Sequence, residues 1–397
     1  MPFENIYPPV SGGMHTCFHL IHSLANQYNV FVVTYQDETI LAAGLAQYDS
    51  SQNIQIYSIK NSLVKKSFVK KKYQSLLYRI KKMEFYKSAD ANFINYNTIV
   101  DQLLRTFHID YFIVQMLSDV QHFSYFKKIS QHTRFIYQSH NVDTELALND
   151  YHKGKISFKK YRRIQLQESS LNKHTDAVLT VSSSDDDKLQ CLNAKKLKSF
   201  VIQTGFVMPK EPATFQVNQN TRNTVVFFGS LNYSPNIQAL HWFIDNCWNS
   251  IRAVVSDAQF LIIGSGNCDN VSSFQQVDGV KIHGFVEDTW DFYNQSAVSI
   301  VPVQEGSGIR IKILESMAMG VPVVSTSIGA EGILCTNGID ILIEDDPHLF
   351  SNRIIEVLSN KELRVSLSSN GRSLINKSYQ WSHIVNNIEK SLEALSA

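Results

Sequence analysis

Residues 305–325, EGSGIRIKILESMAMGVPVVS, constrain the fold more than any other stretch, because three structural signals follow one another there. Ser307 and Gly308 allow the chain to turn tightly. Gly320 ends the helical segment that follows, and the apolar run 321–325 has the length and composition of a buried strand. A loop, a short helix and a strand in this order predict an α/β fold.

The predicted helix carries an apolar stripe on one side. The members of the stripe recur at helical spacing and are Ile313, Leu314, Met317 and Ala318. We expect the stripe to be buried, which leaves Glu315 at the mouth of the loop. The first backbone N–H groups of a helix lack intrahelical partners and lie at the positive end of the helix dipole, so they attract anions.

Two cations stand beside this helix start. Arg310 and Lys312 are two residues apart, so a regular helix would point them to different faces, but at the first turn both could reach one diphosphate. The stretch therefore predicts a phosphate-binding loop. The alternative is an ordinary αβ unit with a solvated basic turn.

Length and composition describe a globular protein. The 397 residues suffice for two domains, and 44% hydrophobic with 18% charged residues shows no bias towards disorder. The net charge of +1 argues against a dedicated nucleic-acid binder. The five cysteines are scattered without a CxxC pair, so neither a disulfide framework nor a zinc site is predicted, and a reducing cytosol fits.

Membrane contact is expected to be peripheral. No run approaches the roughly 18 apolar residues of a transmembrane helix, and the N-terminus lacks a signal-peptide pattern. Residues 60–87 carry ten Lys or Arg and one acid among large apolar residues, which predicts a basic amphipathic helix or helix pair. It could dock to anionic lipid headgroups or be a solvated charged face, and both interpretations stay open.

Residues 8–34 predict a glycine turn, a helix and a strand. Gly12 and Gly13 would bring backbone amides close to a ligand. Three histidines in the helix have spacings that could hold a metal, but no HExxH arrangement supports one, so no metal site is predicted. Only about eleven residues precede the glycines, without a clear apolar run, where a parallel sheet would have its first strand. Either that strand is short or the chain is trimmed.

Further strands are expected at 109–115, 135–139 and 177–181, with a basic helix at 153–168 and a helix cap at 182–184. His140 and Asn141 follow the second of these strands directly. Ligands of open α/β sheets bind at the carboxyl ends of strands, so His140 is a candidate site residue, although a lone histidine is more often structural.

The polar segment 207–224 predicts an interdomain linker. A second α/β series follows it, with strands at 224–228, 259–263, 280–282 and 298–301 and a helical C-terminal part from Pro347 that has a break at Gly371. The GSG at 264–266 lacks the third glycine of a dinucleotide fingerprint, so a nicotinamide site is only weakly supported.

Three segments carry a resemblance to a known family. They are GSLNYSPNIQALHWF at 229–243, GFVEDTWDFY at 284–293 and GIRIKILESMAMGVPVVST at 308–326. With them the chain resembles glycosyltransferase family 4, the retaining group 1 glycosyltransferases, in a bacterial polysaccharide and cell-envelope branch. The resemblance implies the GT-B architecture, in which two Rossmann-like domains face each other across a central cleft.

The implied domains are an acceptor-binding one at 1–207 and a donor-binding one at 208–379, with a C-terminal helix at 380–397 that packs back on the first. The implied activity is sugar transfer from a nucleotide sugar to a glycan or lipid-linked glycan, without cofactor or essential metal, in the cytoplasm or at the inner face of the membrane. A sugar-nucleotide epimerase and a non-catalytic binding partner are the alternatives.

The resemblance also implies residue roles. Glu315 would bind the ribose, Val286 would contact the base, and Gly13 would approach the diphosphate from the N-terminal domain. The implied catalytic residues are His140, Arg310 and Lys312, and the implied donor-binding residues are Gly13, Val286, Gly308, Ile309 and Glu315.

Two departures from the family pattern affect the site. Glu305 precedes Glu315 by ten positions where many members have eight, so a sugar-binding role for Glu305, Gly306 and Ser307 stays open. Residues 230–233, SLNY, stand where many members carry an Arg and a Lys, and we expect the cations at 310 and 312 to take their place.

Overall fold

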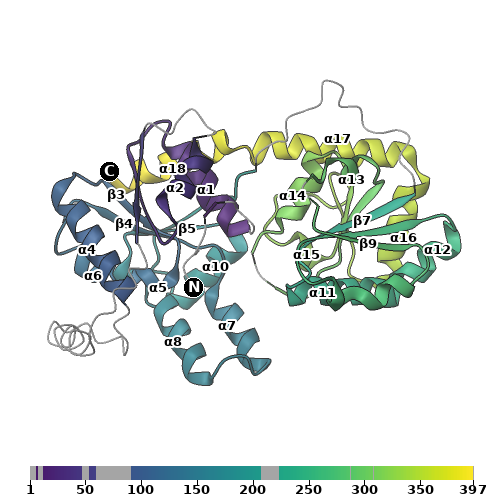
Figure 1. The fold of residues 1–397 in the computed structure, drawn as a ribbon, viewed down its shortest axis with the longest axis horizontal. Helices are drawn as coiled ribbons and strands as arrows, with labels where there is room; N and C mark the ends of the chain where they lie inside the picture. Colours follow the sequence, from purple (N-terminus) through teal and green to yellow (C-terminus); the bar gives the residue numbers. More distant parts are fainter. Residues whose placement is uncertain are drawn as a thin grey trace.

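The computed structural model describes residues 6–7, 12–46, 53–59, 91–206, 223–286, 288–306 and 308–396. Two α/β units stand side by side, one from each half of the chain (Figure 1). The basic segment 60–87, the domain boundary at 207/208 and Ser307 lie outside the described residues.

The N-terminal unit alternates helices and strands. Its elements are α1 (Gly12–Leu24), β1 (Val30–Thr34), α2 (Glu38–Leu45), β2 (Ile54–Ser58), α4 (Ala91–Thr106), β3 (Tyr111–Val114), α5 (Leu117–Val120), α6 (Phe123–Phe126), β4 (Arg134–Gln138), α7 (Asp143–His152), α8 (Phe158–Glu168), α9 (Leu171–His174), β5 (Ala177–Thr180), α10 (Ser183–Leu192) and β6 (Ser199–Val201).

The C-terminal unit begins at β7 (Thr224–Phe228). Its further elements are α11 (Ser234–Phe243), the π-helix η2 (Ile244–Trp248), α12 (Asn249–Val254), β8 (Gln259–Ile263), the 3-10 helix η3 (Cys268–Gln276), β9 (Val280–Gly284), α13 (Trp290–Asn294), β10 (Val298–Val301), α14 (Ile311–Ala318), β11 (Val323–Ser325), α15 (Ser327–Ala330), β12 (Leu342–Ile343), α16 (Pro347–Ser359) and α17 (Lys361–Ser378). The last helix is α18 (Trp381–Ser396).

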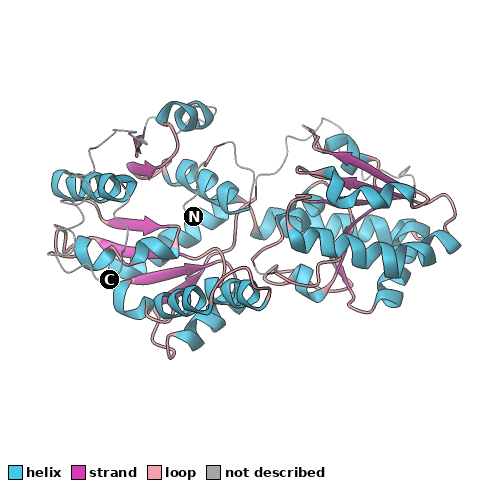
Figure 2. Ribbon diagram, turned by 60° about the horizontal axis from the view of Figure 1, so that its bottom comes forward, coloured by secondary structure: helices cyan, strands magenta, loops and turns pink. Residues whose placement is uncertain are grey.

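Parallel strands build the sheets of both units. The C-terminal sheet has the order β12-β11-β10-β7-β8-β9, and the N-terminal unit holds a β3-β4-β5-β6 sheet and a separate β1-β2 pair. Every strand pair in these sheets is parallel. Figure 2 shows the strands enclosed by helices, which explains why a central strand such as β7, TVVFF, is buried along its whole length. The predicted α/β fold is confirmed.

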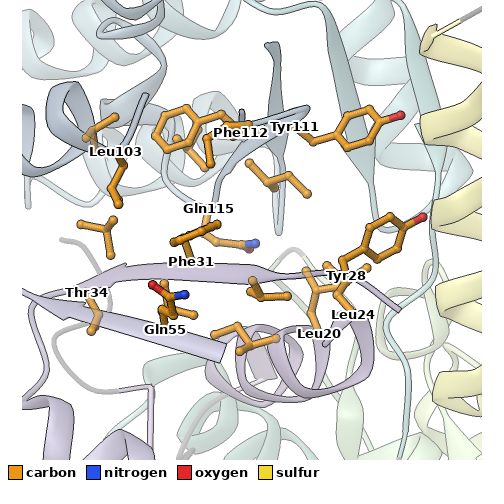
Figure 3. A pocket seen from close by; sticks show the side chains of 18 of the residues that line it. Leu20, Leu24, Tyr28, Phe31, Thr34, Gln55, Leu103, Tyr111, Phe112 and Gln115 are labelled. Carbon is orange, nitrogen blue, oxygen red and sulfur yellow. The ribbon is translucent and has the colours of Figure 1, made fainter. Parts of the chain in front are cut away.

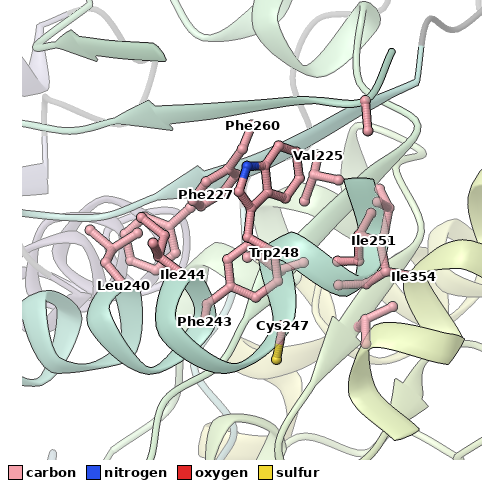
Figure 4. Close-up of a cluster of buried hydrophobic side chains, with 14 of the residues drawn as sticks. Val225, Phe227, Leu240, Phe243, Ile244, Cys247, Trp248, Ile251, Phe260 and Ile354 are labelled. Atoms are coloured by element: carbon pink, nitrogen blue, oxygen red, sulfur yellow. The ribbon is translucent and has the colours of Figure 1, made fainter. Parts of the chain in front are cut away.

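The main core of the C-terminal unit surrounds Trp248 (Figure 4). Its indole packs in a tilted arrangement against Phe243 and Phe260, which come from α11 and β8. The indole Nε1 donates to the carbonyl of Asp278 at 2.9 Å, so the one polar atom of this large side chain is satisfied.

The stripe predicted on the opening helix is confirmed, because Ile313, Leu314, Met317 and Ala318 are all buried. The break predicted at Gly371 is wrong. Gly371 lies inside α17, where a side chain would come within 3.1 Å of the Met317 Cγ. The glycine therefore permits close packing of α17 on α14 instead of ending a helix.

Two other predicted elements begin elsewhere. The helix predicted at 153–168 starts at Phe158, because Gly154 adopts a φ of +69° and turns the chain between α7 and α8. Gly12 and Gly13, predicted in a turn, form the first residues of α1.

Helix α18 returns from the C-terminal unit to the N-terminal one (Figure 1). Trp381, Ile388 and Leu392 share a buried cluster with Leu20 of α1 and Ile136 of β4. A side chain at Gly205 would collide with the Trp381 indole, so the glycine makes room for this contact. None of the helices described here is long and apolar enough to cross a membrane.

Candidate functional site

The candidate site lies where the strands of the C-terminal sheet end. The loops that follow β7, β8, β9 and β10 leave the carboxyl edge of one parallel sheet, which is where open α/β sheets place their ligands. The loop before α14, with the predicted phosphate-binding residues, is one of them.

Glycines allow two of these loops to pack directly on each other. A side chain on Gly264 would lie 1.8 Å from the carbonyl oxygen of Gly229, and one on Gly266, whose φ is +119°, would lie 2.9 Å from the backbone of Asn232. The Leu231 N–H donates to the Ser265 carbonyl at 2.7 Å. The GSG motif is therefore explained by close loop packing, without a dinucleotide.

Arg310 organises the loop before α14. Its guanidinium is buried and donates from Nη2 to the Gly306 carbonyl at 2.8 Å and from Nη1 to the Gly308 carbonyl. Burial lowers the pKa of Arg310, although a guanidinium stays charged in proteins. Gly306 and Gly308 have φ values of +115° and +83°, a conformation that other residues rarely adopt. Arg310 therefore holds the loop through hydrogen bonds to two of its carbonyl groups.

Lys312 places its ammonium at the carboxyl end of β7. The Nζ donates to Asn236 Oδ1 at 2.9 Å and lies 4.2 Å from the centroid of the Phe227 ring. Burial, and then the positive charge of Arg310, lower the pKa of Lys312 to about 7. A side chain at Gly229 would come within 2.7 Å of this Nζ. Lys312 therefore brings a cation to the loop 230–233, which has none of its own.

Glu315 lies one turn beyond Lys312 on the same side of α14. Its carboxylate is half-buried, and the Thr289 hydroxyl donates to Oε1 at 3.5 Å. Burial raises the pKa of Glu315. A carboxylate and an ammonium thus lie on adjacent turns of one helix, with partners in the segments that follow β9 and β7.

Val286 follows β9 and is half-buried against the cluster that contains Phe228 and Tyr293. Its neighbour Phe285 is exposed. Residue 286 therefore lies at the same sheet edge as Glu315, and its predicted contact with a base stays a prediction, as does the predicted donor contact of Ile309.

His140 follows β4 in the N-terminal unit. Its Nε2 lies 2.6 Å from Gln115 Oε1, and Gln115 in turn donates from Nε2 to Gln138 Oε1 at 2.7 Å. In this chain of bonds Gln115 offers its oxygen to the histidine, so Nε2 carries the proton and Nδ1 the lone pair. Burial lowers the pKa of His140 to about 4, so the ring is neutral at pH 7.

A buried carboxylate supports the segment after His140. The two oxygens of Glu168 accept from the N–H groups of Asp143 and Thr144, each at 2.8 Å, at the start of α7. Burial raises the pKa of Glu168 to about 7. The sequence marked Glu168 only as the end of a basic helix, because the N–H groups that donate to it lie 25 and 24 positions away along the chain.

The two units meet at this site. A side chain at Gly308 would lie 2.4 Å from Asn141 Oδ1 and 3.4 Å from the His140 carbonyl, so the glycine loop rests on the segment after β4. Lys153 and Glu305 form an ion pair of 2.5 Å across the boundary. The structure therefore brings the loop of Gly308 to His140, while Gly13 lies in the first turn of α1.

A second contact between the units involves Glu331. The Ser184 hydroxyl and the Lys188 ammonium of α10 donate to Glu331 Oε1 at 2.9 and 3.2 Å. Next to it, a side chain at Gly332 would lie 2.9 Å from the Ser182 Cβ. Ser182 also caps α10, as predicted. Sequence reasoning missed Glu331, Lys188, Asn236 and Gln115, because the partners of each are distant in sequence.

Residues 222–360 match the family described as "Glycosyl transferases group 1". Among curated proteins, an uncharacterized 44.6 kDa protein in the cps region of Klebsiella pneumoniae is 27% identical over 176 residues. The aligned region covers 42% of this chain and 45% of that relative, so it spans less than half of the relative's length.

Solved structures resemble the whole chain. Sucrose-phosphate synthase from Thermosynechococcus elongatus has a TM-score of 0.71 at 14% identity, covering 100% of this chain and 97% of that chain. HepE of Anabaena in complex with UDP and glucose has a TM-score of 0.67 at 14% identity, covering 97% and 98%. The predicted GT-B architecture is thereby confirmed; the predicted assignment to family 4 stays a prediction.

Proposed function

We propose that this chain, whose residues 222–360 match the group 1 glycosyl transferases, moves a sugar from a nucleotide-sugar donor to a glycan or lipid-linked glycan acceptor. The observation that carries the proposal is the pair at the start of α14, where the Lys312 ammonium and the Glu315 carboxylate lie one turn apart beside the glycine loop. An ammonium suits a diphosphate, and a carboxylate suits the two hydroxyls of a ribose.

The similar proteins support the proposed donor class and the proposed role in polysaccharide synthesis. HepE of Anabaena was crystallised with UDP and glucose, so a nucleotide diphosphate sugar is a reasonable donor class for this chain as well. The Klebsiella relative from a cps region supports a role in polysaccharide or cell-envelope synthesis. We propose action in the cytoplasm at the inner membrane face, with residues 60–87 as the membrane contact. Binding to anionic liposomes at low salt tests this, and no binding would contradict it.

The proposed reaction is retaining and needs neither metal nor cofactor. The bond between the anomeric carbon and the diphosphate oxygen breaks, and the acceptor oxygen bonds to the same face of the sugar. The departing phosphate takes the acceptor's proton, so no protein base is needed. Lys312 and the loop amides would stabilise the negative charge that develops on the diphosphate.

His140 would position the donor sugar. Its Nε2 lies 2.6 Å from Gln115 Oε1, and an imidazole ring held in this way can bond a sugar hydroxyl. Burial lowers the pKa of His140 to about 4, which makes it a poor proton donor at neutral pH.

Two roles of Arg310, contact with the leaving diphosphate and support of the loop, predict different kinetics. If it reaches the diphosphate mainly as the leaving group departs, Arg310→Ala lowers kcat more than donor affinity. If its role is instead to hold the loop through its bonds to Gly306 and Gly308, the variant loosens the loop, and donor affinity falls by as much as kcat. For Arg310→Ala we expect kcat to fall more than donor affinity. For Glu315→Ala we expect weaker nucleotide binding.

A thermal-shift screen against nucleoside diphosphates tests the proposal first. A ligand that binds only the folded protein raises its Tm, by an amount that grows with ligand concentration. We expect at least one nucleoside diphosphate to raise Tm in the wild type and to lose most of that effect in Glu315→Ala. If none does so at millimolar concentration, the proposal fails.

Two alternatives remain distinguishable. A sugar-nucleotide epimerase of the same architecture would convert the donor without an acceptor, whereas a transferase needs one to form its product. A binding-only partner would bind the nucleotide without turning the donor over. The division of the N-terminal strands into two groups is the observation that favours this last alternative.

A further inference from the structure

Helices α7 and α8 form a hairpin that stands out from the N-terminal unit (Figure 1). Helix α7 begins at Asp143, three residues after His140, and its ten residues span about 15 Å. The turn at its far end reaches the C-terminal unit, where Lys153 pairs with Glu305. The hairpin therefore extends outward from the candidate site along the boundary of the two units.

The outer part of the hairpin is strongly basic. Residues 151–167 contain six Lys or Arg and no Asp or Glu, although the whole chain has a net charge of only +1. Three of these cations are exposed and pair with no carboxylate of a described residue: Lys159, Lys160 and Arg163. The two lysines precede the arginine by four and three positions, so the three share one side of α8. This side attracts anions.

An aromatic cluster lies beside these cations, since Phe158 directly precedes Lys159. The ring of Tyr151 lies 5.6 Å from that of Phe158 and 6.0 Å from that of Tyr161, centroid to centroid. Phe158 is 55% exposed and Tyr151 37%. Burial of such rings would stabilise the fold, so rings left exposed beside one another indicate an interaction surface. Aromatic faces bind the C–H faces of sugar rings through dispersion.

The cavity of the N-terminal unit is not suited to an anion. It has about 770 Å³ and lies between β1 and β3, where Figure 3 shows Phe31 opposite Phe112. Its described lining residues include Asp110 and Asp119 but no Lys or Arg, and none comes from α7 or α8. Carboxylates repel an anion, and apolar side chains do not solvate it. The hairpin is therefore the better docking surface for an anionic chain.

The turn of the hairpin favours a glycan over a lipid surface as the ligand. A segment that enters a membrane carries apolar side chains at its outermost part. The turn 153–157 reads KGKIS, and its one large apolar residue, Ile156, is half-buried. The aromatic cluster flanks this turn, and two of its three rings bear hydroxyls, which suit hydroxyl-rich sugars.

We propose that the hairpin docks an acceptor glycan built from acidic pyranoses, whose carboxylates bind Lys159, Lys160 and Arg163 while its ring faces contact the aromatic cluster. This assignment rests on the proposed transferase function and names its acceptor class. Carboxylates on sugar rings match the mixture of cations and aromatics in the first turns of α8, where residues 158–163 span about 8 Å. Because α7 starts beside His140, a glycan on the hairpin has one end near the candidate site.

Calorimetric titration of the full-length protein with an oligogalacturonate, without donor, tests the proposal. We expect the triple variant Lys159→Gln, Lys160→Gln, Arg163→Gln to bind about tenfold more weakly than the wild type, because three exposed charges are lost. Phe158→Ala should weaken binding by about threefold. A malto-oligosaccharide of equal length, which has no carboxylates, should bind the wild type more weakly than the oligogalacturonate does.

The matched control is the triple variant Lys196→Gln, Lys377→Gln, Lys390→Gln, which removes three charges from exposed lysines outside the hairpin. We expect it to bind the oligogalacturonate as the wild type does. The Tm of both triple variants should stay close to the wild-type value, since all six substituted side chains are exposed.

Three outcomes would overturn the proposal. Equal affinity in the hairpin variant and the wild type would show that the hairpin does not bind the glycan. An equal loss in the control would assign the effect to net charge. Binding of phosphatidylglycerol vesicles through the three cations, without affinity for the oligogalacturonate, would make the hairpin a membrane contact. If nucleoside diphosphates still raise Tm in these cases, the acceptor class is wrong while the proposed donor site stands.

Discussion

The ammonium of Lys312 donates to Asn236 Oδ1 at 2.9 Å, and this bond fixes a cation from α14 at the carboxyl end of β7. Asn236 belongs to α11 and also donates from Nδ2 to the Ser230 carbonyl at 3.0 Å. One asparagine thus links the loop after β7 to the lysine of α14. The site gains a charge at a strand end whose own loop, SLNY, has none.

This lysine predicts a pH dependence of anion binding. Burial lowers the pKa of Lys312 to about 7, so the empty site loses its charge as pH rises through 7, whereas a bound diphosphate would keep the lysine protonated. We expect affinity for a nucleoside diphosphate to fall about tenfold from pH 6 to pH 8 because of this residue.

Calorimetric titrations at both pH values measure the effect. Lys312→Met should bind the nucleoside diphosphate weakly and lose this component of the pH dependence. Lys281→Met serves as the control, because it removes a lysine that is bonded to Gln259 on β8. Equal pH slopes in wild type and Lys312→Met would refute the assignment. Without ligand, stability should rise with pH above 7, because the unfolded lysine keeps its proton when the folded one has lost it.

Substitution of His140 should lower turnover more than it lowers stability. We expect His140→Ala to reduce kcat by about tenfold or more, the size of a lost hydrogen bond to substrate. Since burial lowers the pKa of His140 to about 4, its titration should leave no inflection in the kcat profile between pH 5.5 and 8.

Gln115→Leu tests how the ring is held, because it removes the acceptor for Nε2–H while His140 stays in place. We expect an intermediate loss of kcat. His174→Ala, which removes a histidine bonded to Ser124 on the short helix α6, provides the control and should leave kcat unchanged. A His140→Ala enzyme with wild-type kcat would rule out the positioning role.

Gly308 allows the two units to approach each other, and its substitution should separate them. Gly308→Ala combines an unfavourable φ of +83° with a Cβ only 2.4 Å from Asn141 Oδ1. Gly338→Ala is matched to it, with a φ of +80° and nothing within 4 Å of its Cβ. Both should lose about 1–2 kcal/mol for the backbone conformation.

Only Gly308→Ala should also raise the KM for the donor, because its extra methyl group displaces Asn141 from the loop. Urea unfolding and steady-state kinetics on the two variants measure both effects. If the two variants are equal in KM, the loop does not need the close contact with the N-terminal unit.

Glu168 predicts a second pH effect, with the opposite sign to that of Lys312. Burial raises the pKa of Glu168 to about 7. Between the ordinary carboxyl value and 7 the folded protein holds a proton that the unfolded chain has given up, so stability falls as pH rises through that window. Glu168→Gln should remove this slope and cost about 1–2 kcal/mol, since one of two backbone N–H groups loses its acceptor.

Urea unfolding at pH 5 and pH 7 tests this, with Glu362→Gln, an exposed acid in the first turn of α17, as the control. A Glu168→Gln variant that keeps the wild-type difference between the two pH values would show that another group titrates.

The sequence predicted best what local periodicity determines. Strands β7, β8 and β10 match their predicted bounds, because continuous apolar runs between turn residues identify buried parallel strands. The stripe on α14 followed from its spacing in the same way. Gly371 was misread, because its close contact with Met317 joins residues 54 positions apart.

The candidate site was predicted in part. Periodicity and strand ends drew attention to Lys312, Glu315 and His140, but their partners Asn236, Thr289 and Gln115 come from other strands and loops. Arg310 was expected to face a ligand, and the structure shows its guanidinium bonded to its own loop. Such bonds depend on how the chain folds back on itself, which spacing along the sequence does not encode.

The central claim is that Lys312 and Glu315 bind a nucleotide-sugar donor whose sugar this chain transfers. Product analysis by NMR with a panel of nucleoside diphosphate sugars and glycan acceptors tests it most directly. The account predicts an acceptor-dependent glycoside that keeps the donor's anomeric configuration, and a loss of at least tenfold in its formation in both Lys312→Met and Glu315→Ala. A glycoside formed at wild-type rate by these two variants would contradict it.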